Sequence, residues 1–172
     1  MPDDQLIRAE RLIRTIPDYP EEGVLFRDIT PLLADAAAVR ATIDAMIEPF
    51  RGGFDVVAGI EARGFLLAGA VAIAAGVGLV PIRKAGKLPR PAVAVDYVLE
   101  YGTATIEAHD DIASGTRVLL VDDVLATGGT LQAAHSLVSQ LGGVVIGTSV
   151  LMELEDLGGR AVVGDVHTIF RA

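Results

Sequence analysis

The chain has 172 residues, 51% of them apolar, a length and composition that fit one domain with a sizeable core. Its net charge of −9 argues against a general nucleic-acid surface, and the lack of Cys excludes disulfides, thiolate metal sites and a cysteine nucleophile. The charged N-terminal residues do not resemble a signal peptide. The apolar stretch 65–81 is too short and too broken by glycine to span a membrane, so we expect a cytoplasmic protein without a membrane partner.

The first predicted element is a helix over residues 3–16, where apolar residues follow helical spacing as far as Pro17. The segment 17–31 is rich in proline and is expected to be irregular. Asp35 can cap a second helix that runs to about Phe50.

A βαβ unit is predicted next. Its strand, turn, helix and second strand cover residues 55–60, 61–64, 65–75 and 79–83. Such a crossover favours a parallel sheet. A basic loop, expected to be mobile, follows over 84–92.

Two segments of alternating polarity, 93–101 and 103–109, predict a hairpin. A nearly continuous apolar run over 117–121 predicts a strand at the centre of the sheet. A helix over 130–141 and strands over 144–152 and 166–170 complete the pattern. We therefore expect an α/β fold, in which a central parallel sheet is flanked by helices.

The strongest functional signal is the segment 118–130, in which a buried strand ends in Asp122 and Asp123. The small residues that follow, Ala126, Thr127, Gly128, Gly129 and Thr130, lead into a helix. Ligands of open α/β sheets bind at such strand ends, and a helix N-terminus attracts anions. The threonine hydroxyls add donors, while the carboxylates suit sugar hydroxyls or a metal ion. This pattern favours a ribose 5-phosphate group over an ordinary strand–turn–helix with a capping threonine.

The densest positive charge lies in residues 83–90. The chain has only two lysines, Lys84 and Lys87, and both lie here between Arg83 and Arg90. The cluster could hold a small anion, or it could be a solvated loop.

The segment 118–130 resembles the phosphoribosyl pyrophosphate signature of the type I phosphoribosyltransferases. Further segments resemble those of its adenine-specific family: the adenine-binding hood at 17–31, the pyrophosphate loop at 61–65, the basic loop at 83–89 and the catalytic hairpin around 99–103. The resemblance implies a single domain over 1–172 with the type I phosphoribosyltransferase fold. Its parts would be a hood (about 1–33), a core (about 34–155) and a flexible β-hairpin lid (about 84–109).

The resemblance implies a purine salvage enzyme that forms AMP and pyrophosphate from adenine and phosphoribosyl pyrophosphate. The transition state would be oxocarbenium-like, and the enzyme a homodimer. Mg²⁺ is the implied cofactor, held mainly by substrate and water close to Asp122 and Asp123, with no ligand required directly from the protein.

The resemblance also assigns roles to individual residues. Leu25 and Arg27 would recognise adenine through backbone groups while Phe26 stacks on its ring. Asp122 and Asp123 would hold the ribose hydroxyls.

Pyrophosphate would be met by Arg63, Arg83, Lys84 and Lys87, the last of which the partner subunit could supply. The Glu61–Ala62 peptide bond is commonly cis in the family. Glu100 would handle the adenine proton and Tyr101 would close the lid, so the implied catalytic set is Glu100, Arg63 and Lys84.

Some alternatives remain open. Taken alone, Phe26 could be a core aromatic and Glu100 a solvated carboxylate, while the scattered His109, His135 and His167 suggest structural roles. A transferase for xanthine, hypoxanthine or orotate is disfavoured by the hood and by residues 100–102. A ligand-sensing transcriptional regulator would need a nucleic-acid-binding domain or a basic face, and the sequence indicates neither.

Overall fold

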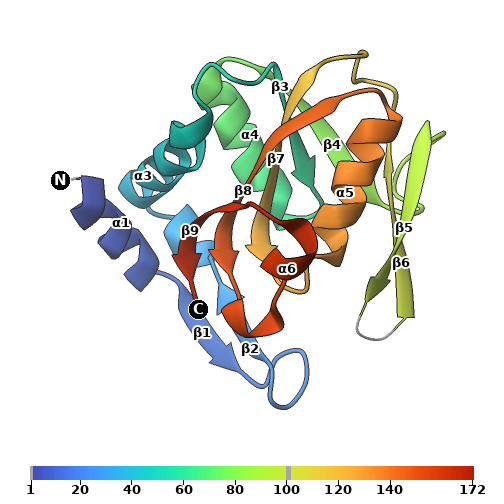
Figure 1. The fold of residues 1–172 in the computed structure, drawn as a ribbon. Helices are drawn as coiled ribbons and strands as arrows, with labels where there is room; N and C mark the ends of the chain where they lie inside the picture. The colour runs from blue at the N-terminus through green and yellow to red at the C-terminus, as the bar shows by residue number, and fades with distance from the viewer. Residues whose placement is uncertain (1, 100–101) are drawn as a thin grey trace. The chain divides into compact units, whose positions relative to one another are not determined.

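The computed structural model describes residues 2–99 and 102–172 (Figure 1). Glu100 and Tyr101, which carry predicted roles, lie outside the described residues. The chain divides into two compact units, residues 1–45 and 46–172. In the described part of the chain, no helix combines the length and the apolar character needed to cross a membrane.

The first unit contains helices and a two-stranded antiparallel sheet. Its elements are α1 (Pro2–Arg11), β1 (Arg14–Pro17), β2 (Leu25–Asp28), α2 (Thr30–Leu33) and most of α3 (Ala36–Ile47). The prediction of a helix through residue 16 is wrong, as is that of irregular structure over 25–28. The backbone of β1 instead pairs with β2, from Arg14 opposite Asp28 to Pro17 opposite Leu25.

The start of α3 agrees with the sequence. The Asp35 carboxylate accepts a hydrogen bond from the backbone N–H of Ala38 at 2.9 Å, as a helix cap does. This bond is the main cause that lowers the pKa of Asp35, and the nearby Arg8 guanidinium lowers it further.

The second unit is built on a seven-stranded sheet with the order β5-β6-β4-β3-β7-β8-β9. Its strands are β3 (Val56–Ile60), β4 (Gly78–Lys84), β5 (Val93–Leu99), β6 (Gly102–Ala108), β7 (Arg117–Leu125), β8 (Val144–Glu153) and β9 (His167–Arg171). The helical segments are η1 (Glu48–Phe50), α4 (Arg63–Ala75), α5 (Gly129–Gln140), η2 (Glu155–Leu157) and α6 (Arg160–Val163). Strands β4, β3, β7, β8 and β9 are parallel, and β5 and β6 form the predicted antiparallel hairpin.

Strand β7 is the middle one of the five parallel strands and has β3 and β8 on its two sides, an interior place in the sheet that its apolar run predicts. The side chains from Val118 to Val121 are fully buried. Those of Val118 and Leu120 pack with residues of α5 and of the neighbouring strands. The strand is four residues longer than the predicted 117–121, because its pairing with β8 continues to Leu125 opposite Glu153. The two aspartates therefore lie within the strand.

The helical crossovers that start from β3 and from β7 run in opposite directions along the sheet. Helix α4 leads from β3 to β4, α5 leads from β7 to β8, and β3 and β7 are neighbours (Figure 1). Because such crossovers are right-handed, helices that cross in opposite directions cover opposite faces of the sheet. The order reverses between β3 and β7, which leaves a crevice at their carboxyl ends where ligands of open α/β sheets bind. The expected fold class is confirmed.

Candidate functional site

Two buried carboxylates lie near the end of β7. Asp122 is 7% exposed and Asp123 is 8% exposed, and the backbone N–H of Asp123 donates to Asp122 Oδ1 at 2.8 Å. Burial raises the pKa of Asp122 well above its ordinary value, and the neighbouring charge of Asp123 raises it further. A buried pair of this kind offers oxygen atoms to the hydroxyl groups of a ligand.

A small cavity adjoins Asp122. It has a volume of about 100 Å³ and is lined in part by Ala126, Thr127, Gly128 and Thr130, the loop that precedes α5. Gly128 has a φ of +89°, and no side chain caps α5. The first N–H groups of the helix have no partner within it, so they are available to an anion.

The start of α4 meets β7 at the same edge of the sheet. The Arg63 guanidinium lies 2.6 Å from Asp123 Oδ2. A Cβ atom on Gly64 would lie 2.7 Å from Asp122 Oδ1 and 3.2 Å from the Val121 carbonyl oxygen, so only glycine allows this close approach. Two segments far apart in the sequence, 61–65 and 118–130, are thus brought together, as the family resemblance implies.

The basic loop is held by a residue to which the sequence assigned no role. One Glu61 carboxylate oxygen accepts the backbone N–H of Lys84 at 3.0 Å and lies 3.4 Å from Arg83 Nε. These interactions, led by the Lys84 N–H, lower the pKa of Glu61. Arg83 also donates to the Lys87 carbonyl oxygen at 2.7 Å. The Arg83 side chain therefore shapes the loop itself. The cis peptide bond expected between Glu61 and Ala62 is present.

Two signals could have singled out Glu61. It is the only acidic residue in the predicted turn 61–64, and it follows the strand that is parallel to β4. Because parallel strands end at one edge of a sheet, residues that follow β3 lie near those that follow β4.

The β5–β6 hairpin lies beside the loop that precedes α5. A Cβ atom on Gly129 would be 3.0 Å from the Val98 carbonyl oxygen in β5. A cleft of about 610 Å³ opens between β5 and α5, with Tyr97, Leu99 and Thr127 among its lining residues. Strand β5, which belongs to the predicted lid, thus lies next to the loop at which the ligand is expected.

The predicted base-recognition residues share strand β2 of the first unit. Leu25 is 53% exposed, while Phe26 and Arg27 are half-buried. The Phe26 ring meets the edge of Tyr19 at a centroid distance of 5.1 Å. The Arg27 side chain donates to Thr15 Oγ1 at 2.5 Å.

The histidines are scattered, as expected. His109 donates to the Pro89 carbonyl oxygen at 2.7 Å, His135 lies 2.8 Å from Thr148 Oγ1, and the His167 ring meets Phe50 edge-on. Burial lowers the pKa of His135. Within residues 2–99 and 102–172, no three His, Cys, Asp or Glu side chains form a group suited to a metal ion.

Comparisons with known proteins indicate the family of the chain. Residues 28–163 match the family described as Phosphoribosyl transferase domain. The chain is 56% identical to an adenine phosphoribosyltransferase of Arthrobacter sp. (strain FB24) over 162 residues, which covers 94% of this chain and 86% of that protein. It is 55% identical to the adenine phosphoribosyltransferase of Thermobifida fusca (strain YX), with coverages of 97% and 96%.

Solved structures show the same relationship. The adenine phosphoribosyltransferase of Rhodothermus marinus superposes with a TM-score of 0.94 at 46% identity and covers 99% of both chains. The enzyme of Saccharomyces cerevisiae, solved with an imino-altritol bisphosphate and adenine, gives a TM-score of 0.89 at 34% identity, covering 96% of this chain and 97% of its own. By sequence and by structure, the chain belongs to the phosphoribosyltransferases and, among these glycosyltransferase enzymes, to the adenine phosphoribosyltransferase family.

Proposed function

We propose that this protein forms AMP and pyrophosphate from adenine and phosphoribosyl pyrophosphate, as a step of purine salvage. The observation that carries the proposal is the meeting of three features at the carboxyl ends of β3 and β7. These features are the uncapped start of α5, the buried Asp122–Asp123 pair and the cationic Arg63. They match the phosphate, ribose and pyrophosphate of one substrate.

The 5-phosphate would bind in the small cavity before α5. The backbone N–H groups of residues 128–130 would donate to its oxygens, aided by the hydroxyls of Thr127 and Thr130. A volume of about 100 Å³ is suited to a single phosphate group. The protein has a net charge of −9, so its overall electrostatic field does not favour anions. Anion binding would therefore depend on this local set of donors.

The ribose would lie against the carboxylates. Asp122 and Asp123 would accept hydrogen bonds from its 2- and 3-hydroxyls, which fixes C1 relative to the base. Because both side chains are buried and one has a raised pKa, the pair can also donate a hydrogen bond to a hydroxyl oxygen. Their negative charge would favour an oxocarbenium-like transition state, in which the bond from C1 to pyrophosphate is largely broken.

The pyrophosphate would be held by Arg63, Arg83, Lys84 and Lys87, whose charges stabilise the leaving group as the bond breaks. The described residues offer Mg²⁺ only scattered carboxylates and the Asp122–Asp123 pair, a hard-oxygen donor set that suits a cation held mainly by substrate and water. When bound, Mg²⁺ would neutralise charge on the diphosphate.

Adenine would be recognised by the hood. Leu25 and Arg27 would offer backbone groups, and stacking on Phe26 would contribute about 1–3 kcal/mol. Glu100 would accept or relay the proton released from adenine, and Tyr101 would close the lid. Closure of the β5–β6 hairpin would exclude water, which otherwise hydrolyses the activated sugar.

A radiolabelled-base assay tests the proposal. With phosphoribosyl pyrophosphate and Mg²⁺, labelled adenine should be converted to AMP, and chelation of the metal should stop the reaction. Turnover of hypoxanthine or guanine in place of adenine would contradict the assignment.

Two further proposals can be tested with the same protein. The variant Glu100→Gln should lower kcat while leaving the affinity for phosphoribosyl pyrophosphate nearly unchanged, and wild-type turnover would remove Glu100 from the mechanism. A homodimer should appear in light scattering at the expected mass. If the partner supplies Lys87, then subunits of Lys87→Ala mixed with subunits of Glu100→Gln should regain part of the activity.

A further inference from the structure

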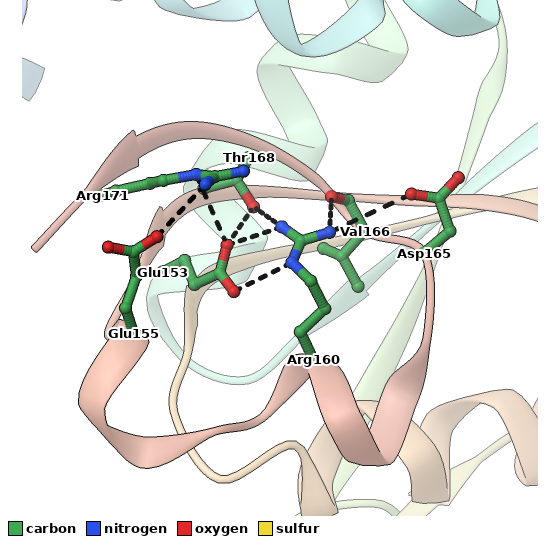
Figure 2. A network of polar contacts seen from close by, with 7 residues as sticks. All are labelled: Glu153, Glu155, Arg160, Asp165, Val166, Thr168 and Arg171. Atoms are coloured by element: carbon green, nitrogen blue, oxygen red, sulfur yellow. Dashed lines mark hydrogen bonds and ion pairs between the residues drawn. The ribbon is translucent and has the colours of Figure 1, made fainter.

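An ion-pair network surrounds the buried Glu153 at the end of β8 (Figure 2). Arg160, the first residue of α6, donates through Nε to Glu153 Oε1 at 3.0 Å and through Nη2 to Glu153 Oε2 at 2.5 Å. It also donates to the Val166 carbonyl oxygen at 2.9 Å and to Thr168 Oγ1 at 3.1 Å. Glu153 is only 5% exposed, and Arg160 is the first cause of its lowered pKa.

The residue before Arg160 packs against the loop that precedes α5. A Cβ atom on Gly159 would lie 2.2 Å from the Ala126 carbonyl oxygen. A Cβ atom on Gly128 would lie 2.7 Å from the Gly159 carbonyl oxygen and 3.0 Å from Val162 Cβ. The backbones of the two segments are therefore in direct contact, and α6 forms the outer wall of the loop.

Helix α6 cannot hold that position by itself. It has four residues and ends at Gly164, and an isolated helix of this length is unstable in water. Its place must come from tertiary contacts. The guanidinium of Arg160 supplies them, because its donors reach the end of β8, the start of β9 and the segment between α6 and β9.

Glu153 in turn is fixed to the other end of the same loop. It lies opposite Leu125, the last residue of β7, and its carbonyl oxygen accepts the N–H of Ala172 at 2.9 Å. The ion pair thus links the strand that enters the loop to the helix that covers the loop.

We propose that Arg160 is a positioning residue for the phosphate end of the substrate. Held by Glu153, it presses Gly159 against residues 126–128 and so fixes the direction in which the loop N–H groups point. It does not touch the ligand itself. The inference rests on the proposed function, in which this loop binds the 5-phosphate. The geometry requires arginine, because a planar fork can engage both carboxylate oxygens while the ammonium group of lysine cannot.

The test compares Arg160→Lys with Arg117→Lys. Arg117 is a matched control, because it makes a similar two-bond pair with Asp55 at the start of β7, with distances of 3.1 and 2.6 Å. Calorimetry would measure the binding of ribose 5-phosphate, pyrophosphate and adenine to each folded variant. In Arg160→Lys we expect the dissociation constant of ribose 5-phosphate to rise at least about tenfold, because small displacements of a binding group are costly. Pyrophosphate and adenine should bind as in the wild type, and Arg117→Lys should bind all three normally.

The outcomes that count against the reasoning can be told apart. Unchanged ribose 5-phosphate binding in Arg160→Lys overturns the inference and leaves the proposed function standing. Equal weakening of all three ligands overturns it as well, because it reveals a general loss of structure. A wild-type protein that does not bind ribose 5-phosphate refutes the proposed function itself. If Arg160→Lys does not fold, Thr168→Val removes one acceptor of the guanidinium and should weaken ribose 5-phosphate alone, and no change there overturns the inference.

Discussion

Removal of the Glu61 carboxylate should selectively weaken binding of the pyrophosphate end. In Glu61→Ala, the backbone N–H of Lys84 loses its acceptor at 3.0 Å and Arg83 loses its partner at 3.4 Å. The Glu61 side chain is 15% exposed, so solvent replaces these interactions only in part. A hydrogen bond to a charged group contributes about 1.5–3 kcal/mol. If the substrate must restore the loop, that energy corresponds to about 10- to 150-fold in affinity.

The assay is a set of Michaelis constants with binding measured in parallel. The KM of phosphoribosyl pyrophosphate and the dissociation constant of pyrophosphate should rise, while those of adenine and ribose 5-phosphate stay constant. Glu61→Gln should show a smaller rise, because its amide oxygen can still accept the Lys84 N–H. Asp55→Ala is the matched control, since Asp55 also accepts a backbone N–H, that of Arg117, at 2.9 Å. Wild-type pyrophosphate affinity in Glu61→Ala would refute the reasoning.

Three other predictions concern the second unit. Gly128→Ala should abolish ribose 5-phosphate binding in calorimetry, because its φ is +89° and the new Cβ would lie 2.7 Å from a carbonyl oxygen; retained binding would contradict this. Arg117 lowers the pKa of Asp55 from 3.8 to about 2, so this pair stabilises the fold above pH 4 and is lost as the pH falls toward 2. The loss of stability between pH 4 and 2, followed by circular dichroism, should therefore be less steep in Asp55→Asn. An unchanged curve would refute the link between this ion pair and the pH dependence of stability. Gly147→Ala would place a Cβ 2.2 Å from the Phe50 ring, so Tm should fall by about 2–12 °C, the effect of 1–3 kcal/mol in a chain of this size; an unchanged Tm in a thermal melt would show that the ring can move aside.

The parts of the site that the sequence predicted are those encoded locally. A run of apolar residues that ends in Asp122 and Asp123, followed by small residues and a helix, defines both the strand and the anion site within one short segment. The β5–β6 hairpin could also be predicted from the local sequence, because polar and apolar residues alternate in its two arms on either side of Gly102. Arg63 and the 83–87 cluster could be paired with this segment only through the family resemblance, since their proximity depends on the order of the strands.

The predictions that were wrong or missing concern residues whose structure depends on tertiary contacts. Residues 14–16 fit a helical pattern, yet they pair with 26–28, and a pairing across a loop leaves no local periodicity. The length of β7 was underestimated because its last residues are held by β8, whose register is a tertiary property. Glu153 and Arg160 were missed for a related reason. Their ion pair matters through the contact of Gly159 with residues 126–128, and that contact is a tertiary one that no local pattern indicates.

The uncapped start of α5 has a practical consequence for anyone who handles this protein. A ligand that binds only the folded state raises its stability, by about 2.7 kcal/mol at one hundred times its dissociation constant. For a chain of this length, that amounts to a rise in Tm of about 5–11 °C. Inorganic phosphate is small enough for the cavity, so the choice of buffer would become part of the result. In phosphate the protein would appear more heat-resistant than in an amine buffer, and its affinity for a phosphorylated sugar would be underestimated.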